Sequence, residues 1–258
     1  MSQEESMGIY IFCGIQTETD ESFDTVEIEG ETKELFTVRY RDAAIVAAEV
    51  PMKIYHPNKE NLLMHQNAVA NVMKKNDTVI PVSFGNVFQS KEDVGVLLEN
   101  LYPQFEKLFP EIKGKIELGL KVIGKKEYLE SQINENSKID RMAKSVKGKS
   151  EAASYYERIQ LGGAAQKIIT SLQQEVKSEV SAPLAELAEA SKINDPIGEK
   201  MLLNAAFLVD RDKEAEFDQK VNEIHEEWKD KVDFNYSGPW PAYNFINIRL
   251  KVEDPDAS

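Results

Sequence analysis

The chain has 258 residues, with 31 Lys and Arg against 45 Asp and Glu, so its net charge near neutral pH is −14. Such a charge repels nucleic acid and anionic lipid, and we expect neither as a partner. A hydrophobic fraction of 41% can fill cores, which excludes wholesale disorder, and the length suits one large or two small domains.

Cysteine use and the amino terminus predict a protein that stays in the reducing cytoplasm. The single cysteine, Cys13, can neither form an internal disulfide nor build a thiolate metal cage. Glu4 and Glu5 stand where a signal peptide needs positive charge. No run approaches about 18 uninterrupted apolar residues, so we expect no membrane span.

The first fifty residues predict three strands. The β-branched and aromatic run 8–15 is typical of a covered strand, with Cys13 as a small core residue. Residues 27–34 are the densest part of an acidic stretch, which predicts a solvated hairpin tip or loop. The runs 35–40 and 43–50, separated by two residues, predict an antiparallel hairpin.

A helix and a strand with a proline follow. Helical spacing over residues 61–75 predicts a helix with Asn58 as its N-cap and Asn76 as a left-handed residue at its end. Residues 78–84 read as a strand, and Pro81 places it at a sheet edge or bulge because proline has no N–H to donate.

The next helix and strand complete the first domain. Ser90 is an N-cap candidate for the apolar stripe 94–108, which we expect Pro103 to kink or end early. The strict alternation of residues 116–123 predicts a strand with one apolar face. We place the end of this domain near Gly124.

After a basic connector, the second half again shows the patterns of strands and helices. Residues 125–149 turn basic and predict a helical connector, and residues 155–180 form a long amphipathic stripe. We expect that stripe to bend or break at Gly162-Gly163, to stop near Pro183 and to cover a sheet.

The carboxyl-terminal residues predict further strands around one helix. Residues 201–209 read as a strand, with a short helix as the alternative, and residues 212–231 as an amphipathic helix. A short strand at 234–236, rigid non-regular chain at 237–241 and a closing strand at 243–250 are expected to follow.

These elements predict an α+β fold with two domains, residues 7–124 and residues 150–252. We expect each domain to be a mixed or antiparallel sheet with helices on one face, related to the ferredoxin-like fold. The helical basic connector, residues 125–149, joins them.

Catalytic and metal-binding patterns are absent from the sequence. Three histidines, His56, His65 and His225, share no metal-ligand spacing, and we expect a turn residue and two boundary residues with hydrogen-bond partners. No nucleophile elbow, Walker loop or dinucleotide glycine pattern occurs. We therefore assign no catalytic, cofactor-binding or metal-binding residue and expect no cofactor.

Two segments rich in proline, glycine and aromatic residues, 81–88 and 238–245, are unusual. One interpretation is that they plug the ends of the sheets. The other is a preformed surface for an apolar partner, because aromatic anchors offer large contact area at small entropy loss. The candidate partner-binding residues are Pro81, Phe84, Phe88, Pro239, Trp240, Pro241, Tyr243 and Phe245.

Five blocks stand in a specific order over about residues 7–250. They are residues 10–15, the helix with His65, Val69 and Val72, the run 78–88, the strand 114–121 and residues 238–245. In these blocks the chain resembles the GvpL/GvpF family of gas vesicle proteins. It differs from the family pattern at Ser83 and Asn86, where members often have Arg and Thr, and at Ala242, where a third proline is common.

The resemblance implies a role in building gas vesicles, hollow gas-filled protein shells, as an assembly factor or minor structural protein without catalytic activity. It implies two α+β domains related to the ferredoxin-like fold and binding to the small hydrophobic shell protein, with other accessory gas vesicle proteins as further partners. The expected location is the cytoplasm and the gas vesicle.

Two other function classes stay open at this point. One is an enzyme on a ferredoxin-like scaffold, a hydrolase or a monooxygenase, with Arg39, Arg41 and His65 as its polar centre. The other is a general scaffold that binds several proteins through the basic residues 138–149. The sequence does not indicate the oligomeric state.

Overall fold

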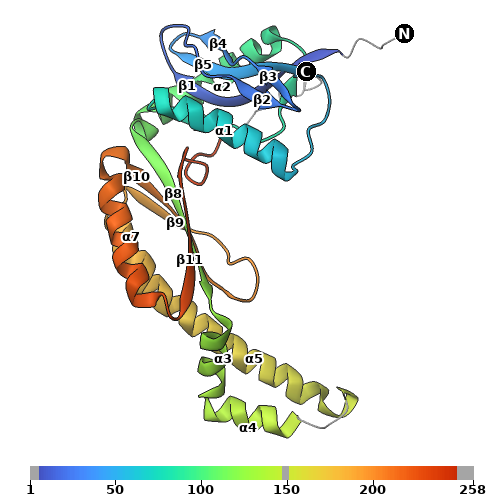
Figure 1. Ribbon diagram of the computed structural model, residues 1–258, viewed down its shortest axis with the longest axis vertical. Coiled ribbons are helices and arrows are strands. Elements are labelled where there is room, and N and C mark those ends of the chain that lie inside the picture. Colours follow the sequence, from blue (N-terminus) through green and yellow to red (C-terminus); the bar gives the residue numbers. More distant parts are fainter. Residues whose placement is uncertain (1–5, 147–150, 249–258) are drawn as a thin grey trace, which may run out of the picture. The chain divides into compact units, whose positions relative to one another are not determined.

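The computed structural model describes residues 6–146 and 151–248, which fold as two compact units (Figure 1). The first unit takes in the chain up to Ile116 and again from Trp240, and the second unit is Glu117–Pro239. The α+β class with two main sheets is confirmed. The relation to the ferredoxin-like fold is not confirmed.

The first unit is built around an antiparallel sheet in the strand order β4-β5-β1-β6, with β7 as a further partner of β1. The predicted acidic hairpin tip is a separate pair of strands, β2 and β3. The bounds are β1 Met7–Gln16, β2 Val26–Ile28, β3 Glu31–Lys33, β4 Phe36–Tyr40, β5 Ala43–Pro51, β6 Val79–Pro81 and β7 Val87–Phe88.

Helix α1, Lys59–Lys75, is capped as predicted, because the Asn58 side chain accepts a hydrogen bond from the Asn61 N–H (2.8 Å). The prediction for Asn76 is wrong: its φ is −125°. The Asn76 side chain instead donates to the Gln16 carbonyl (3.1 Å) and accepts from the Thr78 N–H (2.9 Å). These bonds stabilise extended chain leading directly into β6.

Helix α2, Lys91–Ile112, runs through Pro103 and ends well after it, which corrects the prediction of an early stop. Proline removes only one intrahelical hydrogen bond. Buried side chains before and after it, Leu101 and Phe105, hold both parts of the helix against the sheet. Tertiary packing therefore outweighs the local penalty.

The two helices cover opposite faces of the sheet rather than the single face expected. Tyr10 of β1 contacts His65 of α1, whereas the next residue, Ile11, lies with Phe105 of α2. Successive residues of a strand point to opposite faces, so α1 and α2 lie on different sides. Both faces of β1 are buried for this reason.

The second unit contains the sheet β11-β8-β10-β9. Helix α7 packs on it through Phe217, whose ring lies 5.2 Å from that of Phe207 and 6.4 Å from that of Tyr236. The strands are β8 Lys115–Gly124, β9 Ala190–Ile193, β10 Met201–Asp210 and β11 Val232–Trp240. The helices are α3 Lys126–Asn134, α4 Ser137–Val146, α5 Glu151–Val176, α6 Ala182–Ala185 and α7 Glu214–Trp228, with a π-helical turn Lys177–Ser181 before α6 and a 3₁₀ turn Arg211–Lys213 before α7.

The predicted domain boundary near Gly124 differs from the boundary of the structure. Strand β8 hydrogen-bonds to β10 and β11, so the division falls at Ile116. Within the predicted connector, α3 and α4 are helical as expected but belong to the second unit. Residues 147–149 lie outside the described part of the chain.

Two other predictions need correction near Gly162-Gly163 and at the carboxyl end. Helix α5 continues unbroken through these glycines, so the predicted break does not occur. Strand β11 includes residues 237–240, which we expected to be non-regular. Residues 243–248 form turns and irregular chain in place of a closing strand, and residues 249 and 250 are not described. Residues 201–209 are a strand, as predicted.

Gly238 allows β11 to approach β8. Its φ of +131° lies in the region that favours glycine. A Cβ atom there would lie 2.9 Å from the Glu117 carbonyl oxygen, too close for any other residue. Gly238 therefore permits β11 to pair with β8 in a segment rich in proline and aromatic residues, which we had expected to be non-regular.

A tight contact between sheet and helix in the first unit leads to a prediction. A Cβ atom at Gly14 would overlap the Phe105 ring. Because both residues are buried, we expect Gly14→Ala to lower the free energy of unfolding by about 1–3 kcal/mol through overpacking. Urea denaturation of the purified protein measures this change.

Gly95→Ala is the matched control, since a Cβ at Gly95 in α2 would meet nothing within 4 Å. We expect it to raise stability by about 0.5–1 kcal/mol, because alanine favours the helix. Equal stability of Gly14→Ala and wild type would contradict the packing argument.

Candidate functional site

A cavity of about 370 Å³ opens in the first unit. Its walls come from the sheet (Ile11), from α2 (Leu97 and Phe105), from β7 (Phe88) and from the carboxyl-terminal segment (Ile246). Most of the lining is apolar, and the polar exceptions are Ser83, Asn86 and Asn247. A largely apolar hollow with a few polar groups suits an apolar ligand or side chain.

The cavity brings together the two unusual segments of the sequence. Pro81 and Phe88 come from the first segment and Tyr243 from the second, and all three line the same hollow. Residues more than 150 positions apart in the chain therefore form one surface, which no sequence pattern indicated.

The other candidate residues do not line the cavity. Phe84 turns to the opposite side, where its ring contacts Tyr10 (6.2 Å) and His65 (5.9 Å). Pro239 is exposed on β11 in the second unit. Trp240 and Phe245 are half-buried and Pro241 is buried, all outside the lining.

Sequence reasoning missed the α2 part of the lining. Leu97, Leu101 and Phe105 were interpreted as one core stripe, because helical spacing does not distinguish a side chain under a cavity from one packed in the core. Leu97 is only half-buried, and this exposure is visible only in the structure.

Hydrogen bonds hold the chain between β6 and β7 in place. The Asn86 carbonyl accepts from the Ile11 N–H (3.1 Å), as a direct extension of the sheet. The Gly85 N–H donates to the Tyr10 hydroxyl (3.0 Å), and a ring nitrogen of His65 lies 3.2 Å from the Val82 carbonyl. Hydrogen bonds to β1 and to α1 thus fix the loop that borders the cavity.

The partners of His65 determine its tautomer. A carbonyl oxygen only accepts, so the His65 Nε2 facing Val82 must carry the proton. The other nitrogen, Nδ1, then accepts from the Tyr10 hydroxyl at 3.0 Å, and the Tyr10 oxygen accepts from Gly85. Every polar atom of this buried chain has a partner, which confirms the prediction of a hydrogen-bonded boundary histidine.

Burial keeps the titratable groups of this core neutral. It lowers the pKa of His65 to about 4 and raises the pKa of Tyr10 to about 12. It also raises the pKa of the Cys13 thiol. At pH 7 none of these groups is charged, so they act as structural groups.

The residues proposed for an enzyme centre are not assembled into one site. Arg39 donates to the Glu18 carbonyl and lies 3.6 Å from Asp20. Arg41 lies over the rings of Tyr40 and Tyr102 instead. The two ring nitrogens of His65 are bonded to the Tyr10 hydroxyl and the Val82 carbonyl, and neither arginine is among these partners.

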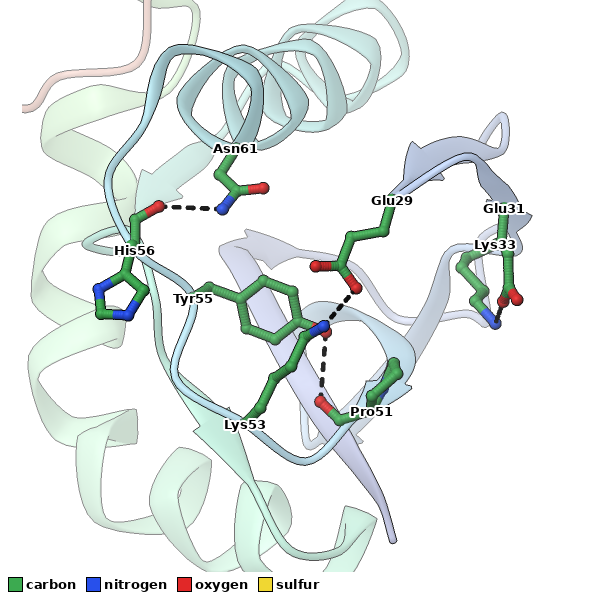
Figure 2. A network of polar contacts seen from close by, with 8 residues as sticks. All are labelled: Glu29, Glu31, Lys33, Pro51, Lys53, Tyr55, His56 and Asn61. Atoms are coloured by element: carbon green, nitrogen blue, oxygen red, sulfur yellow. Dashed lines mark hydrogen bonds and ion pairs between the residues drawn. The ribbon is translucent and has the colours of Figure 1, made fainter. Parts of the chain in front are cut away.

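The loop after β5 is fixed by separate polar contacts (Figure 2). The Tyr55 hydroxyl donates to the Pro51 carbonyl (3.2 Å), and the His56 carbonyl accepts from the Asn61 side chain (2.9 Å). The His56 imidazole is exposed, as predicted for a turn residue. Among the residues that the structure describes, no group of acidic, His or Cys side chains could hold a metal ion.

Within the described ranges, no helix has the length and apolar character needed to cross a bilayer.

The buried His65 predicts a loss of stability in acid. Its folded-state pKa of about 4 lies below the ordinary 6.5, so the unfolded chain binds the proton first as the pH falls. The stabilisation is complete above pH 6.5 and declines toward pH 4. Between pH 7 and pH 4.5 we expect His65 to account for about 2 kcal/mol of lost unfolding free energy.

Urea unfolding of wild type and His65→Gln at both pH values tests this. The variant has no titratable group at this position, so its loss between the two pH values should be smaller by that amount. An identical pH dependence in both proteins would rule out His65 as the source.

The chain matches the family model described as gas vesicle synthesis protein GvpL/GvpF over residues 8–247. It is 24% identical to gas vesicle protein F1 of Halobacterium salinarum over 242 residues, covering 93% of each chain. It is 26% identical to gas vesicle protein F of a Nostoc species over 247 residues, covering 94% of this chain and 99% of that protein.

Two crystal structures share the fold. The gas vesicle protein GvpF from Anabaena sp. PCC7120 superposes with a TM-score of 0.77 at 22% identity, covering 95% of this chain and all of that one. GvpF from Microcystis aeruginosa gives a TM-score of 0.72 at 19% identity, with 92% and 98% covered. Because the family model spans nearly the whole sequence, the chain belongs to the gas vesicle synthesis protein GvpL/GvpF family.

Proposed function

We propose that this protein assists gas vesicle formation by binding the small hydrophobic shell protein in the cavity of the first unit. The observation that carries the proposal is the shared lining of that cavity, to which both proline-aromatic segments contribute through Phe88 and Tyr243. Apolar walls fixed by a hydrogen-bonded loop favour a preformed binding surface, which limits the entropy cost of binding.

The chemistry of a gas-filled shell explains why such a partner is needed. A wall whose inner face excludes liquid water requires subunits with large exposed apolar surface, and such subunits aggregate before they join. A carrier with a net charge of −14 repels other copies of itself and keeps the bound subunit apart from its neighbours. Binding in the cavity covers part of the apolar surface of the shell subunit until that subunit joins the vesicle wall.

The family is one of gas vesicle proteins and is not a known enzyme family. We accordingly propose a binding function without catalysis, as an assembly factor or a minor component of the wall. The neutral, fully bonded state of the buried His65 favours this interpretation. The proposed place of action is the cytoplasm and the surface of growing vesicles, where other accessory gas vesicle proteins are further candidate partners.

Replacing Tyr243 tests the cavity as the binding site. Tyr243 is 42% exposed, so Tyr243→Ala removes apolar lining with little effect on the core. We expect the shell protein to bind about tenfold more weakly, the loss of about 1.4 kcal/mol that is common for an interface aromatic. Co-expression and capture of shell protein by the tagged variant measures this loss.

Tyr156→Ala is the matched control, because Tyr156 is 79% exposed on α5 in the second unit. It should capture shell protein as well as wild type does. A second variant, Ser83→Trp, places a large side chain in the cavity. If folded Tyr243→Ala and folded Ser83→Trp both captured shell protein as well as wild type does, this cavity would be excluded as the binding site.

A further inference from the structure

The amino-terminal half of α5 carries a face that no described residue covers. Tyr155, Tyr156 and Ile159 are 60%, 79% and 55% exposed, and the two tyrosine rings lie 5.6 Å apart. We predicted that the apolar stripe of residues 155–180 would be buried against a sheet. Its later residues Leu172 and Val176 are buried, but its first residues are not. We call Tyr155, Tyr156, Arg158 and Ile159 the α5 tip.

The sequence on either side of the α5 tip is basic in a protein that is otherwise strongly acidic. Residues 138–167 contain seven Lys and Arg against three Asp and Glu, a charge of +4, so the rest of the chain carries −18. Arg158 stands within the tip, where its Nε donates to the Ser154 hydroxyl (2.9 Å). An apolar surface with basic neighbours is complementary to an acidic protein surface.

Two glycines adjoin the tip. A Cβ atom at Gly162 or at Gly163 would meet nothing within 4 Å. Each glycine costs a helix about 0.5–1 kcal/mol relative to alanine, and no packing in the described chain requires it. Their lack of side chains permits another chain to approach the helix backbone closely.

The complementary charge occurs in the first unit of the same sequence. Residues 18–34 contain eight acidic residues against Lys33 alone. Lys33 and Lys53, the two lysines beside the β2–β3 hairpin, already pair with Glu31 and Glu29 at 2.6 Å (Figure 2). Asp20 and Asp24 pair in the same way with Arg39 (3.6 Å) and Lys75 (3.4 Å). Eight carboxylates against these four cations still leave the segment with a net negative charge.

We propose that the α5 tip of one copy of this chain docks on the acidic hairpin surface, residues 18–34, of a second copy. The net charges of the two copies repel, but at physiological salt charges more than about 8 Å apart are largely screened, so the local match dominates. The contact joins different surfaces of the two copies, so it is heterologous and can extend beyond a dimer.

This contact uses neither the cavity nor its lining, so it is independent of shell-protein binding. An accessory protein that assembles head to tail could present several cavities in a row. The proposal goes beyond the proposed function for this reason, and either can fail alone.

Sedimentation velocity of the full chain and two variants tests the contact. Tyr156→Glu alters the tip, and Glu27→Lys with Glu34→Lys alters the hairpin, all at exposed positions. Wild-type mass should rise above the monomer value of 29.2 kDa with concentration and return to it in high salt. Each variant alone should remain a monomer.

An equimolar mixture of the two variants gives the decisive result. The tip variant retains its hairpin and the hairpin variant retains its tip, so the mixture should form a dimer of twice the monomer mass and no larger species. Lys177→Glu, an exposed charge change outside the tip, is the control and should assemble like wild type.

Two results would overturn the proposal. Wild type that is monomeric at every concentration would mean that the tip has a different partner, and a mixture that stays monomeric would exclude the head-to-tail contact. Shell-protein capture by Tyr156→Glu is measured in parallel. It should equal that of wild type, which separates a failure of this contact from a failure of the cavity.

Discussion

The first unit depends on strand β1 being covered on both of its faces. Tyr10 points to α1 and enters the hydrogen-bond chain with His65, while Ile11 lines the cavity and Gly14 faces Phe105 of α2. Gly14 sets how closely α2 approaches, because the Phe105 ring occupies the space of a missing side chain. One strand thus determines both the rigid support of the site loop and the shape of the apolar hollow.

The polar core around Tyr10 and His65 explains how an apolar site can be preformed without charges. A buried polar group is costly unless it is bonded, and here the donors and acceptors form a closed set that includes the backbone of Val82 and Gly85. The network therefore fixes loop geometry by directional bonds. The side chains that line the cavity can then be largely apolar, since backbone groups and the Tyr10–His65 pair position the loop.

The two segments of opposite charge lie in different units of the fold. The acidic residues 18–34 belong to the first unit, whereas the basic residues around α5 belong to the second. A uniformly acidic protein would only repel its copies, but this separation combines overall repulsion with one complementary pair of surfaces. The cavity lies in the first unit, apart from the α5 tip, so binding of an apolar partner and contact between copies place separate demands on the sequence.

Local patterns in the sequence determined the α+β class, the two capped helices α1 and α2, the β4–β5 hairpin and the edge position of Pro81, because each depends on neighbouring residues. The blocks of residues also indicated the family. Only the tertiary structure decided that β8 joins the second sheet, that α2 continues through Pro103, and that Phe88 and Tyr243 share one cavity. Those features depend on contacts between residues far apart in the sequence. The energies of these contacts exceed local conformational preferences, and the contacts leave no periodic pattern in the sequence.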